Sequence, residues 1–549
     1  MTNFGVLTSA TTTCCYEVMK KVILAFLVFS FCNAFAQEDA WVYFADKPDT
    51  ESFFTNPLSF FTERAINRRL QQNIALDSKD VPISESYVAT VENSSGIVVL
   101  AKSRWFNAVH VRGSVDDINA LQNLTFVSEI DFANSNLNAS GRFQQSLVNK
   151  HNTEALTDFS YGFANAQIQQ INGQVVHQSD FTGTGKIIAV LDSGFPGVFT
   201  AAPFERLVNN NRILGTYNYV TRETNVANNS SHGTAVLSTM GGFIENQYAG
   251  TAPDAEYYLF VTEDVASENP VEESLWVEAA EEADRLGVDV INTSLGYFQY
   301  DNASYSYTFA DMNGETAFIS RGADIAFSRG MIVVVSAGNS GGSSTPNISA
   351  PADAQHAFTI GAVDNQGNLA SFSSVGPTAD NRIKPDVVAR GVTAAVIGPT
   401  GSVSGANGTS FSAPIVSGMI TSLWQALPNF TNQQIMDLIR NTASSAANPQ
   451  NTIGYGIPNF GNALQNGLTT TDFTKNTVQV FPNPFSNQLS MSQIEETTHL
   501  DVFTVEGKRI YQALVTENTS LDTANWSKGI YLFVFHQNGS TTIKKLIKN

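Results

Sequence analysis

The sequence predicts an α/β fold in three layers, with a mostly parallel sheet between helices, preceded by a small α+β unit and followed by an all-β sandwich. Three patterns carry this prediction. Nearly continuous apolar runs fill the middle of the chain, helical segments separate these runs, and residues 478–549 alternate apolar and polar side chains with period two. At 549 residues the chain is long enough for about three or four domains with separate cores.

Residues 1–36 are predicted to be a signal peptide. Lys20-Lys21 precedes the apolar stretch VILAFLVFSF, and Ala34-Phe35-Ala36 has the small-x-small form of a secretory cleavage site. The stretch is too short to span a bilayer, and a buried strand is the alternative for it. Because no targeting pattern precedes Met19, that residue is an alternative start. All three cysteines lie before the cleavage site, which excludes a disulfide framework and a cysteine nucleophile from the exported chain.

Residues 37–150 are predicted to form the α+β unit and a linker. The segment GIVVLAKSRWFNAVHVRG predicts two strands, SVDDINALQNL a helix with an acidic first turn, and TFVSEIDF a further strand. The polar segment NSNLNASGRFQQSLVNKHN has no periodicity and is expected to be an exposed, cleavable linker.

Residues 151–467 are predicted to form the central domain. The strands GKIIAVLDSG, AEYYLFVTED, VDVINTSLG and GMIVVVSAGN alternate with helices such as EESLWVEAAEEADRLG and GADIAFSRG. Strands that are apolar on both faces indicate a parallel sheet covered by helices on both sides. A final helix pair, SFSAPIVSGMITSLWQAL and TNQQIMDLIRNTA, closes the domain. Polar residues gather at the carboxyl ends of the strands, where ligands of such sheets collect.

Residues 468–477 are predicted to be a polar linker, and residues 478–549 a compact all-β module with period-two alternation. The formal charge of −20 argues against a nucleic-acid partner, because no extended face could neutralise a phosphate backbone.

Three short motifs place reactive side chains at the ends of predicted elements. Asp192 ends the strand KIIAVLD, although an Asp-Ser-Gly sequence also suits a turn, a cation ligand or a helix cap. His232 opens the small-residue helix HGTAVLSTMGG, where a histidine is often only capped or solvated. Ser410 lies in GTSFSAP at the start of a helix, where unpaired N–H groups favour an oxyanion; a capping serine is the alternative. Gly408 leaves room for a substrate carbonyl, and Pro414 is expected in the first helical turn.

The three motifs together indicate more than each does alone. A serine hydroxyl becomes a nucleophile when an imidazole takes its proton, and a carboxylate must orient that imidazole. The chain supplies Asp192, His232 and Ser410 in this order.

The motifs AVLDSG, SHGTAV and GTSFSAP resemble the three signature segments of the subtilisin-like serine proteases, and VVVSAGN resembles a fourth. The resemblance covers about residues 155 to 465. It implies that Asp192 orients the base, His232 is the general base, Ser410 attacks the scissile carbonyl, and Asn339 hydrogen-bonds the oxyanion. The backbone N–H of Ser410 would be the second oxyanion donor.

The resemblance also implies a substrate-binding segment. INTSLGY is similar to the strand that pairs with the substrate backbone, which makes Ser294, Leu295 and Gly296 one wall of the specificity pocket and Gly338 part of another. Where many relatives have a second glycine, this chain has Tyr297, which leaves the shape of the pocket open. The alternative is that Leu295 and Gly296 merely end a sheet strand.

The flanking units fit the same family. Residues 37 to about 131 are placed like a subtilisin propeptide, which would inhibit the enzyme within its own chain. The segments VFPNPF, VFTVEGKRIY, KGIYLFVF and KKLIKN resemble the type IX secretion sorting domain of Bacteroidetes, with a carbohydrate-binding or spacer sandwich as the alternative. The resemblance implies a secreted or cell-surface protein with protein or peptide substrates and outer-membrane secretion machinery as a partner. No metal site or required cofactor is expected, although family analogy allows calcium.

Two other functions remain open at this point. A serine-carboxyl peptidase shares the fold but uses a glutamate as base, which the histidine in SHGT argues against. An inactive surface protein used for adhesion usually lacks a member of the triad, whereas this sequence has all three and Asn339. The sequence therefore favours a secreted serine endopeptidase made as a proenzyme, working through an acyl-enzyme intermediate. His177 and His356 stand outside these motifs and are expected to be ordinary surface or packed histidines.

Overall fold

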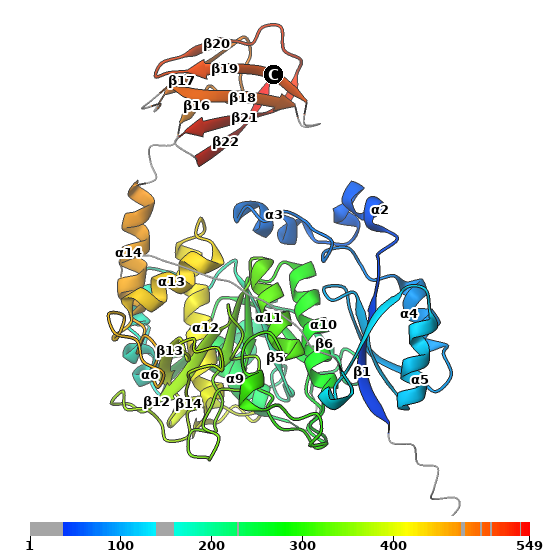
Figure 1. The fold of residues 1–549 in the computed structure, drawn as a ribbon. Helices are drawn as coiled ribbons and strands as arrows, with labels where there is room; N and C mark the ends of the chain where they lie inside the picture. The colour runs from blue at the N-terminus through cyan, green and yellow to red at the C-terminus, as the bar shows by residue number, and fades with distance from the viewer. Residues whose placement is uncertain are drawn as a thin grey trace, which may run out of the picture. The chain divides into compact units, whose positions relative to one another are not determined.

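The computed structural model describes residues 37–138, 159–227, 230–473, 478–492, 494, 497–504, 508–537 and 540–548 (Figure 1). It divides into two compact units, residues 1–150 with 155–461, and residues 462–549 with 151–154. The predicted signal peptide and residues 139–150 of the predicted linker lie outside the described residues.

The first unit begins with an antiparallel sheet in the order β2-β3-β1-β4. Its strands are β1 (Glu38–Phe44), β2 (Val98–Ser103), β3 (Ala108–Gly113) and β4 (Val127–Phe132), and its helices are α2 (Thr50–Thr55), α3 (Glu63–Gln71), α4 (Glu85–Glu92) and α5 (Val115–Ala120). Val42, Val109 and Ile118 lie in the apolar layer between this sheet and its helices. The predicted strands and helix of this region are all present, and β1 adds a central strand that sequence reasoning did not find.

A seven-stranded parallel sheet in the order β13-β12-β11-β10-β5-β9-β6 forms the centre of the unit. The strands are β5 (Ile187–Asp192), β6 (Ile213–Asn218), β9 (Glu256–Val261), β10 (Val290–Thr293), β11 (Ile332–Ser336), β12 (Phe358–Val363) and β13 (Val387–Arg390). Every residue of β5, β10, β11 and β12 is buried, as strands covered on both faces require. The predicted parallel sheet is confirmed.

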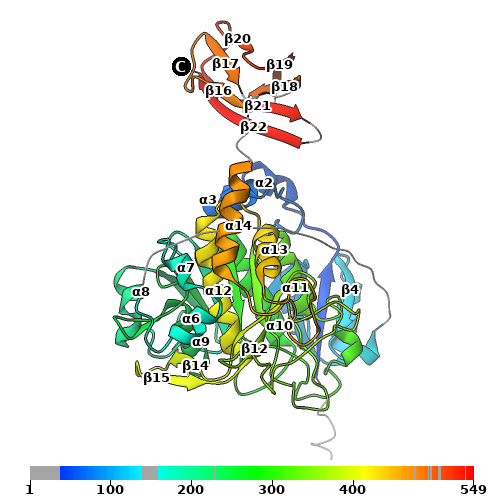
Figure 2. The ribbon, with the colours of Figure 1, turned by 90° about the vertical axis from the view of Figure 1, so that its left-hand side faces the viewer.

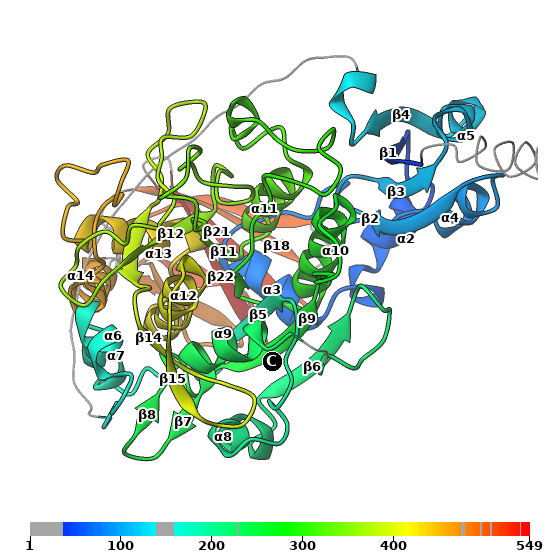
Figure 3. The same ribbon diagram turned by 90° about the horizontal axis from the view of Figure 1, so that it is seen from below.

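Helices cover both faces of this sheet and complete the three layers (Figure 3). On one face lie α9 (His232–Gly241) and α12 (Thr409–Ala426), and on the other α10 (Val271–Leu286) and α11 (Phe318–Ser328). Around them are the helices α6 (Asn165–Gln170), α7 (Gln174–His177), α8 (Glu205–Asn209) and α13 (Asn432–Thr442), and the strand pair β14 (Ala394–Ile397) and β15 (Val403–Ala406) (Figure 2). A second strand pair consists of β7 (Phe243–Ile244) and β8 (Tyr248–Ala249) (Figure 3).

Two details differ from the sequence predictions. Pro414 lies in the second turn of α12, not in the first, so the carbonyl of Ser410 four residues earlier has no intrahelical donor. The hydroxyl of Ser294 donates to that carbonyl at 3.0 Å instead. The helix α14 (Phe460–Phe473) extends into the predicted linker 468–477, whose last four residues lie outside the described part.

The N-terminal sheet and helices pack against α10 through buried charges. Asp284 on α10 is fully buried and accepts hydrogen bonds from Arg68 at 2.5 Å, Arg69 at 2.8 Å and Arg104 at 2.7 Å. The positive charges of the three arginines hold the pKa of this carboxyl below its usual value, although burial opposes them. Losing Asp284 would therefore leave several buried cations with less compensation.

The second unit contains a three-stranded sheet in the order β16-β17-β20 and a four-stranded sheet in the order β19-β18-β21-β22. The strands are β16 (Gln479–Phe481), β17 (Gln488–Ser492), β18 (Thr498–Thr504), β19 (Arg509–Val515), β20 (Ser520–Asp522), β21 (Gly529–Gln537) and β22 (Ser540–Lys548). Apolar residues of both sheets, including Leu489, Leu500 and Phe533, share one core. The predicted all-β sandwich is confirmed. Within the described residues, no helix has the length and apolar character needed to cross a membrane.

Candidate active site

Asp192 and His232 meet at the carboxyl edge of the parallel sheet. Asp192 is the last residue of β5, and His232 is the first residue of α9. The Nδ1 atom of His232 donates to Asp192 Oδ1 at 2.8 Å, and the same oxygen accepts from the backbone N–H of Ser193 at 2.7 Å. Asp192 is buried, whereas 36% of the His232 side chain is exposed. The buried carboxylate thus orients an imidazole whose other edge solvent or a substrate can reach.

Charge determines the acidity of His232. The negative charge of Asp192 raises the pKa of the imidazole above 6.5, although burial works against this, and Glu263 adds to the rise. The carboxylate therefore makes His232 a stronger proton acceptor.

Ser410 is the second residue of α12, and Gly408 precedes the helix with a φ of +149°, a conformation that glycine adopts without strain. The Ser410 hydroxyl donates to the carbonyl of Ser294 at 3.2 Å, and the hydrogen bonds of the described residues include none between Ser410 and His232. The ring of Phe411, next in sequence, lies 5.7 Å from the imidazole ring. The start of α12 is therefore beside the histidine.

Asn339 follows β11 in a loop and is held by one neighbour. Its Oδ1 accepts from the backbone N–H of Thr409 at 2.9 Å and from the Thr409 hydroxyl at 3.0 Å. Because these donors fix the oxygen, Nδ2 points to the other side of the amide. A methyl group built on Gly408 would lie 3.6 Å from this nitrogen, so the donor faces the backbone that precedes Ser410.

A cavity of about 510 Å³ opens between these segments. All the predicted binding residues line it, together with Asn339 and Ser410; the full set is Glu268, Ser294, Leu295, Gly296, Phe298, Gln299, Ser336, Gly338, Asn339, Ser340, Ser343, Thr345, Ser349, Thr409 and Ser410. Sequence reasoning missed most of the serine and threonine lining as well as Glu268, because these residues lie in loops without a recognisable motif.

Tyr297 does not line this cavity. The residue is buried, its hydroxyl donates to Glu263 Oε1 at 2.6 Å, and its ring stacks on Tyr300 at 6.1 Å. Burial raises the pKa of Glu263 to about 7. Tyr297 therefore packs behind the cavity and is not part of its lining.

His177, which lies outside the three motifs, is packed inside this unit. His177 is fully buried between the hydroxyl of Tyr161 at 3.1 Å and the carbonyl of Thr251 at 3.0 Å, and burial lowers its pKa to about 4.

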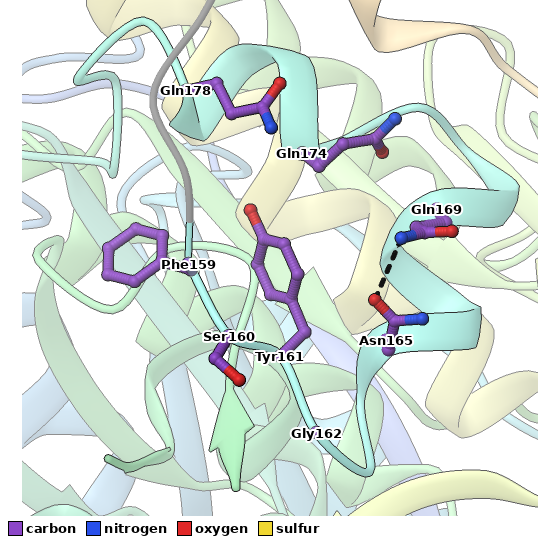
Figure 4. A pocket seen from close by; sticks show the side chains of 8 residues that line it. All are labelled: Phe159, Ser160, Tyr161, Gly162, Asn165, Gln169, Gln174 and Gln178. Carbon is purple, nitrogen blue, oxygen red and sulfur yellow. Dashed lines mark hydrogen bonds between the residues drawn. The ribbon is translucent and has the colours of Figure 1, made fainter. Parts of the chain in front are cut away.

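Tyr161 also lines a separate polar pocket of about 330 Å³, whose amide side chains include Gln174 and Gln178 (Figure 4). The residues that line this pocket do not include Asp192, His232 or Ser410.

Acidic and histidine side chains that converge on one point could hold a metal ion. Among the described residues of this unit, no group of three acidic or histidine side chains converges on a common point.

Comparison with known proteins settles the family. The model of the subtilase family matches residues 183–456, which contain Asp192, His232, Asn339 and Ser410. Subtilisin Savinase from Lederbergia lenta is 30% identical over 294 residues, which are 53% of this chain and 95% of that protein. This chain belongs to the subtilase family.

A second subtilisin agrees with this assignment. Subtilisin NAT from Bacillus subtilis subsp. natto is 32% identical over 302 residues, covering 54% of this chain and 70% of that protein. The solved MycP3 protease from the type VII (ESX-3) secretion system is 21% identical and covers 58% of this chain and 92% of its own, with a TM-score of 0.45.

The flanking regions of this subtilase also match known models. Residues 39–152 match the peptidase S8 propeptide domain of Bacteroidota, and residues 479–549 match the secretion system C-terminal sorting domain. The chain is therefore a subtilisin-like serine endopeptidase, made as a proenzyme and exported to the cell surface or beyond.

Proposed function

We propose that Asp192, His232 and Ser410 form the catalytic triad of this endopeptidase. The observation that carries the proposal is the convergence of the oriented Asp192–His232 pair, Ser410 and the lined cavity at one edge of the sheet. His232 removes the proton from Ser410 through its Nε2 atom, since Nδ1 is engaged with Asp192. Ser410 Oγ then forms a bond to the scissile carbonyl carbon, and the negative charge passes to the carbonyl oxygen.

Asn339 and the first turn of α12 stabilise that charge. The amide Nδ2 of Asn339 donates to the oxyanion, and the backbone N–H of Ser410 is the second donor, since N–H groups of a first helical turn have no intrahelical partner. The positive end of the helix dipole adds to their effect. Collapse of the intermediate transfers a proton from His232 to the leaving amine, and water then hydrolyses the acyl-enzyme by the same route.

In this structure, which includes the propeptide region, the Ser410 hydroxyl donates to the carbonyl of Ser294 and not to His232. Rotation of the Ser410 side chain about its Cα–Cβ bond redirects the hydroxyl to the imidazole when substrate fills the cavity. Catalytic hydrogen bonds of this kind often tighten only in the substrate complex. Leu295 and Gly296 on one wall, and Gly338 on another, hold the side chain that precedes the scissile bond.

The flanking regions serve folding control and export. Residues 37–150 act as an intramolecular inhibitor with its linker, residues 151–467 catalyse, and residues 478–549 engage the outer-membrane secretion machinery. The buried contacts of Asp284 with three N-terminal arginines support the first assignment. Protein or peptide chains are the substrates, and the reaction requires no cofactor.

Hydrolysis of a protein substrate by the mature enzyme tests the triad. Ser410→Ala is expected to lower kcat by about six orders of magnitude, the scale typical for loss of a triad nucleophile. The matched control is Ser412→Ala, because Ser412 lies in the same turn and its hydroxyl bonds only within the helix, to Thr409 O at 3.0 Å. Equal hydrolysis by the parent and Ser410→Ala would refute the proposal.

A further inference from the structure

Two histidines and an aspartate lie close together in the C-terminal unit, apart from the candidate active site. His499 and Asp501 are two residues apart on β18, and His536 on β21 pairs directly with His499. Leu500 and Val502, which alternate with them, are buried in the core of the sandwich. Because side chains of a strand alternate between faces, the three polar side chains lie together on the outer face of the four-stranded sheet.

Two distances within this trio are close to those between ligands of one ion. His499 Nδ1 lies 3.4 Å and His536 Nε2 lies 3.6 Å from the same Asp501 oxygen, Oδ2. The three ligand atoms all lie within 4.8 Å of one another. Ordinary hydrogen bonds between such groups are about 2.7–3.2 Å long. A tetrahedral zinc ion with bonds of about 2.0–2.1 Å separates its ligands by about 3.3 Å, which is close to both distances.

Arg509 and Gln512 contact the side chains of this trio and can hold them in place. Arg509 Nη1 donates to Asp501 Oδ1 at 3.0 Å, which occupies that oxygen and leaves Oδ2 facing the histidines. The amide nitrogen of Gln512, Nε2, lies 2.7 Å from Nε2 of His499. Turning this amide by 180° brings its oxygen to the same place, where it accepts the Nε2–H and leaves the Nδ1 lone pair for an ion. Such outer contacts typically fix the tautomer of a ligating histidine.

Another pair in the chain shows the ordinary alternative. His356 Nδ1 lies 3.0 Å from Asp324 Oδ1, a hydrogen-bond distance, and the same oxygen accepts from the His356 backbone N–H at 2.7 Å. That pair is a simple hydrogen-bonded pair without a third ligand. Among the described residues, only the trio on β18 and β21 brings three such groups within reach of one ion.

We propose that His499, Asp501 and His536 bind a divalent transition-metal ion, with zinc as the best fit. Two imidazoles and one carboxylate are common zinc ligands, and water would complete the tetrahedron. The ion would link β18 to β21 across the sheet and stabilise the sorting domain against unfolding, since binding to the folded state alone shifts the equilibrium toward it. None of the three ligands belongs to the proposed catalytic machinery.

Zinc and cobalt titrations of the full-length chain test this site. The chain carries Ser410→Ala so that self-cleavage cannot remove its C-terminal unit, and it is first freed of metal with a chelator. Equilibrium dialysis is expected to give about one bound Zn²⁺ that His499→Ala and His536→Ala each weaken at least tenfold. Co²⁺ should give the intense visible bands of a tetrahedral site in the parent and lose them in both variants.

The controls separate this site from other histidines. His356→Ala, which removes a histidine of the ordinary pair, should bind Zn²⁺ like the parent. Zinc should raise the melting temperature of the sorting domain in the parent but not in His499→Ala. The proposal is overturned if the parent binds no Zn²⁺, if both ligand variants bind it as tightly as the parent, or if only His232→Ala abolishes binding, which would place the ion in the active site.

Discussion

Replacing Asn339 with leucine should remove one of two proposed oxyanion donors while leaving substrate binding intact. The amide oxygen of Asn339 is fixed by Thr409, so the donor Nδ2 is already in place before the substrate arrives. Loss of a preorganised donor typically costs about 2.7–4 kcal/mol in the transition state, or about 10²- to 10³-fold in kcat. KM for a peptide substrate should change little, because the donor acts mainly on the charged intermediate.

Thr409→Val should lower kcat less than Asn339→Leu does, because it removes a hydroxyl that orients Asn339 and not the oxyanion donor itself. The substitution removes the hydroxyl, which donates to Asn339 Oδ1 at 3.0 Å and accepts from the Gly338 backbone N–H at 3.2 Å, and it keeps the Thr409 backbone N–H that donates to Asn339 Oδ1 at 2.9 Å. One net hydrogen bond is worth about 1 kcal/mol, so kcat should fall about fivefold. Thr409→Ser, which keeps the hydroxyl, is the matched control and should stay close to the parent.

The double variant tests the coupling between the two residues. If Thr409 acts by orienting Asn339, Thr409→Val should cost almost nothing further once Asn339 is leucine. Steady-state kinetics on one peptide substrate would measure all four rates. A less than threefold loss in Asn339→Leu, or the same loss from Thr409→Val in both backgrounds, would refute the role assigned to this pair.

Three further predictions follow from the site and its flanks. Because His232 must be neutral to accept a proton and Asp192 raises its pKa above 6.5, kcat/KM should rise with pH through that raised pKa. In Asp192→Asn the midpoint of the pH–rate profile should move to lower pH. An unmoved midpoint would contradict the electrostatic explanation. A Cβ atom on Gly296 would lie 2.4 Å from Ser349 Oγ, and both residues line the cavity. Gly296→Val should therefore lower kcat/KM far more for substrates with a large side chain before the scissile bond than for substrates with alanine there. Equal losses for both substrates would show that Gly296 does not contact that side chain. Asp284→Asn in the mature enzyme should raise the inhibition constant of added residues 37–138 at least about 100-fold, because it leaves buried arginines less compensated at a cost of about 3 kcal/mol or more. Glu282→Gln is the control and should leave the inhibition constant unchanged, because its partner Arg285 lies on the same helix. Equal inhibition constants for Asp284→Asn and the parent, in a titration of protease activity, would show that the charges do not hold the inhibitor.

The arrangement of the central domain could be predicted because its strands are apolar on both faces. A strand such as β5, buried at every residue, leaves the sequence few alternatives to a sheet covered by helices. The motif residues lie at strand and helix ends for the same reason, since the carboxyl edge of such a sheet is where polar side chains can gather.

Contacts between distant loops could not be predicted in this way. The hydrogen bond from Ser294 to the carbonyl of Ser410 depends on Pro414, whose missing N–H frees that carbonyl only because α12 begins at Thr409. A proline pattern alone does not reveal where a helix begins. The burial of Tyr297 against Glu263 likewise depends on packing between segments that share no local sequence signal.

The buried charges around α10 show the same limit. Arg68 and Arg69 have the composition of an exposed helix end, and only the folded unit places them against Asp284. Propensity and periodicity describe one segment at a time, whereas a buried ion pair is a property of two.

Labelling of the mature protein with a fluorophosphonate measures the nucleophile most directly. Such reagents react with serine hydroxyls that a neighbouring base has activated. Mass spectrometry of the labelled peptides should place the adduct on Ser410 alone, and His232→Ala should abolish labelling. An adduct on another serine, such as Ser193 beside Asp192, or undiminished labelling in His232→Ala, would contradict the proposed triad.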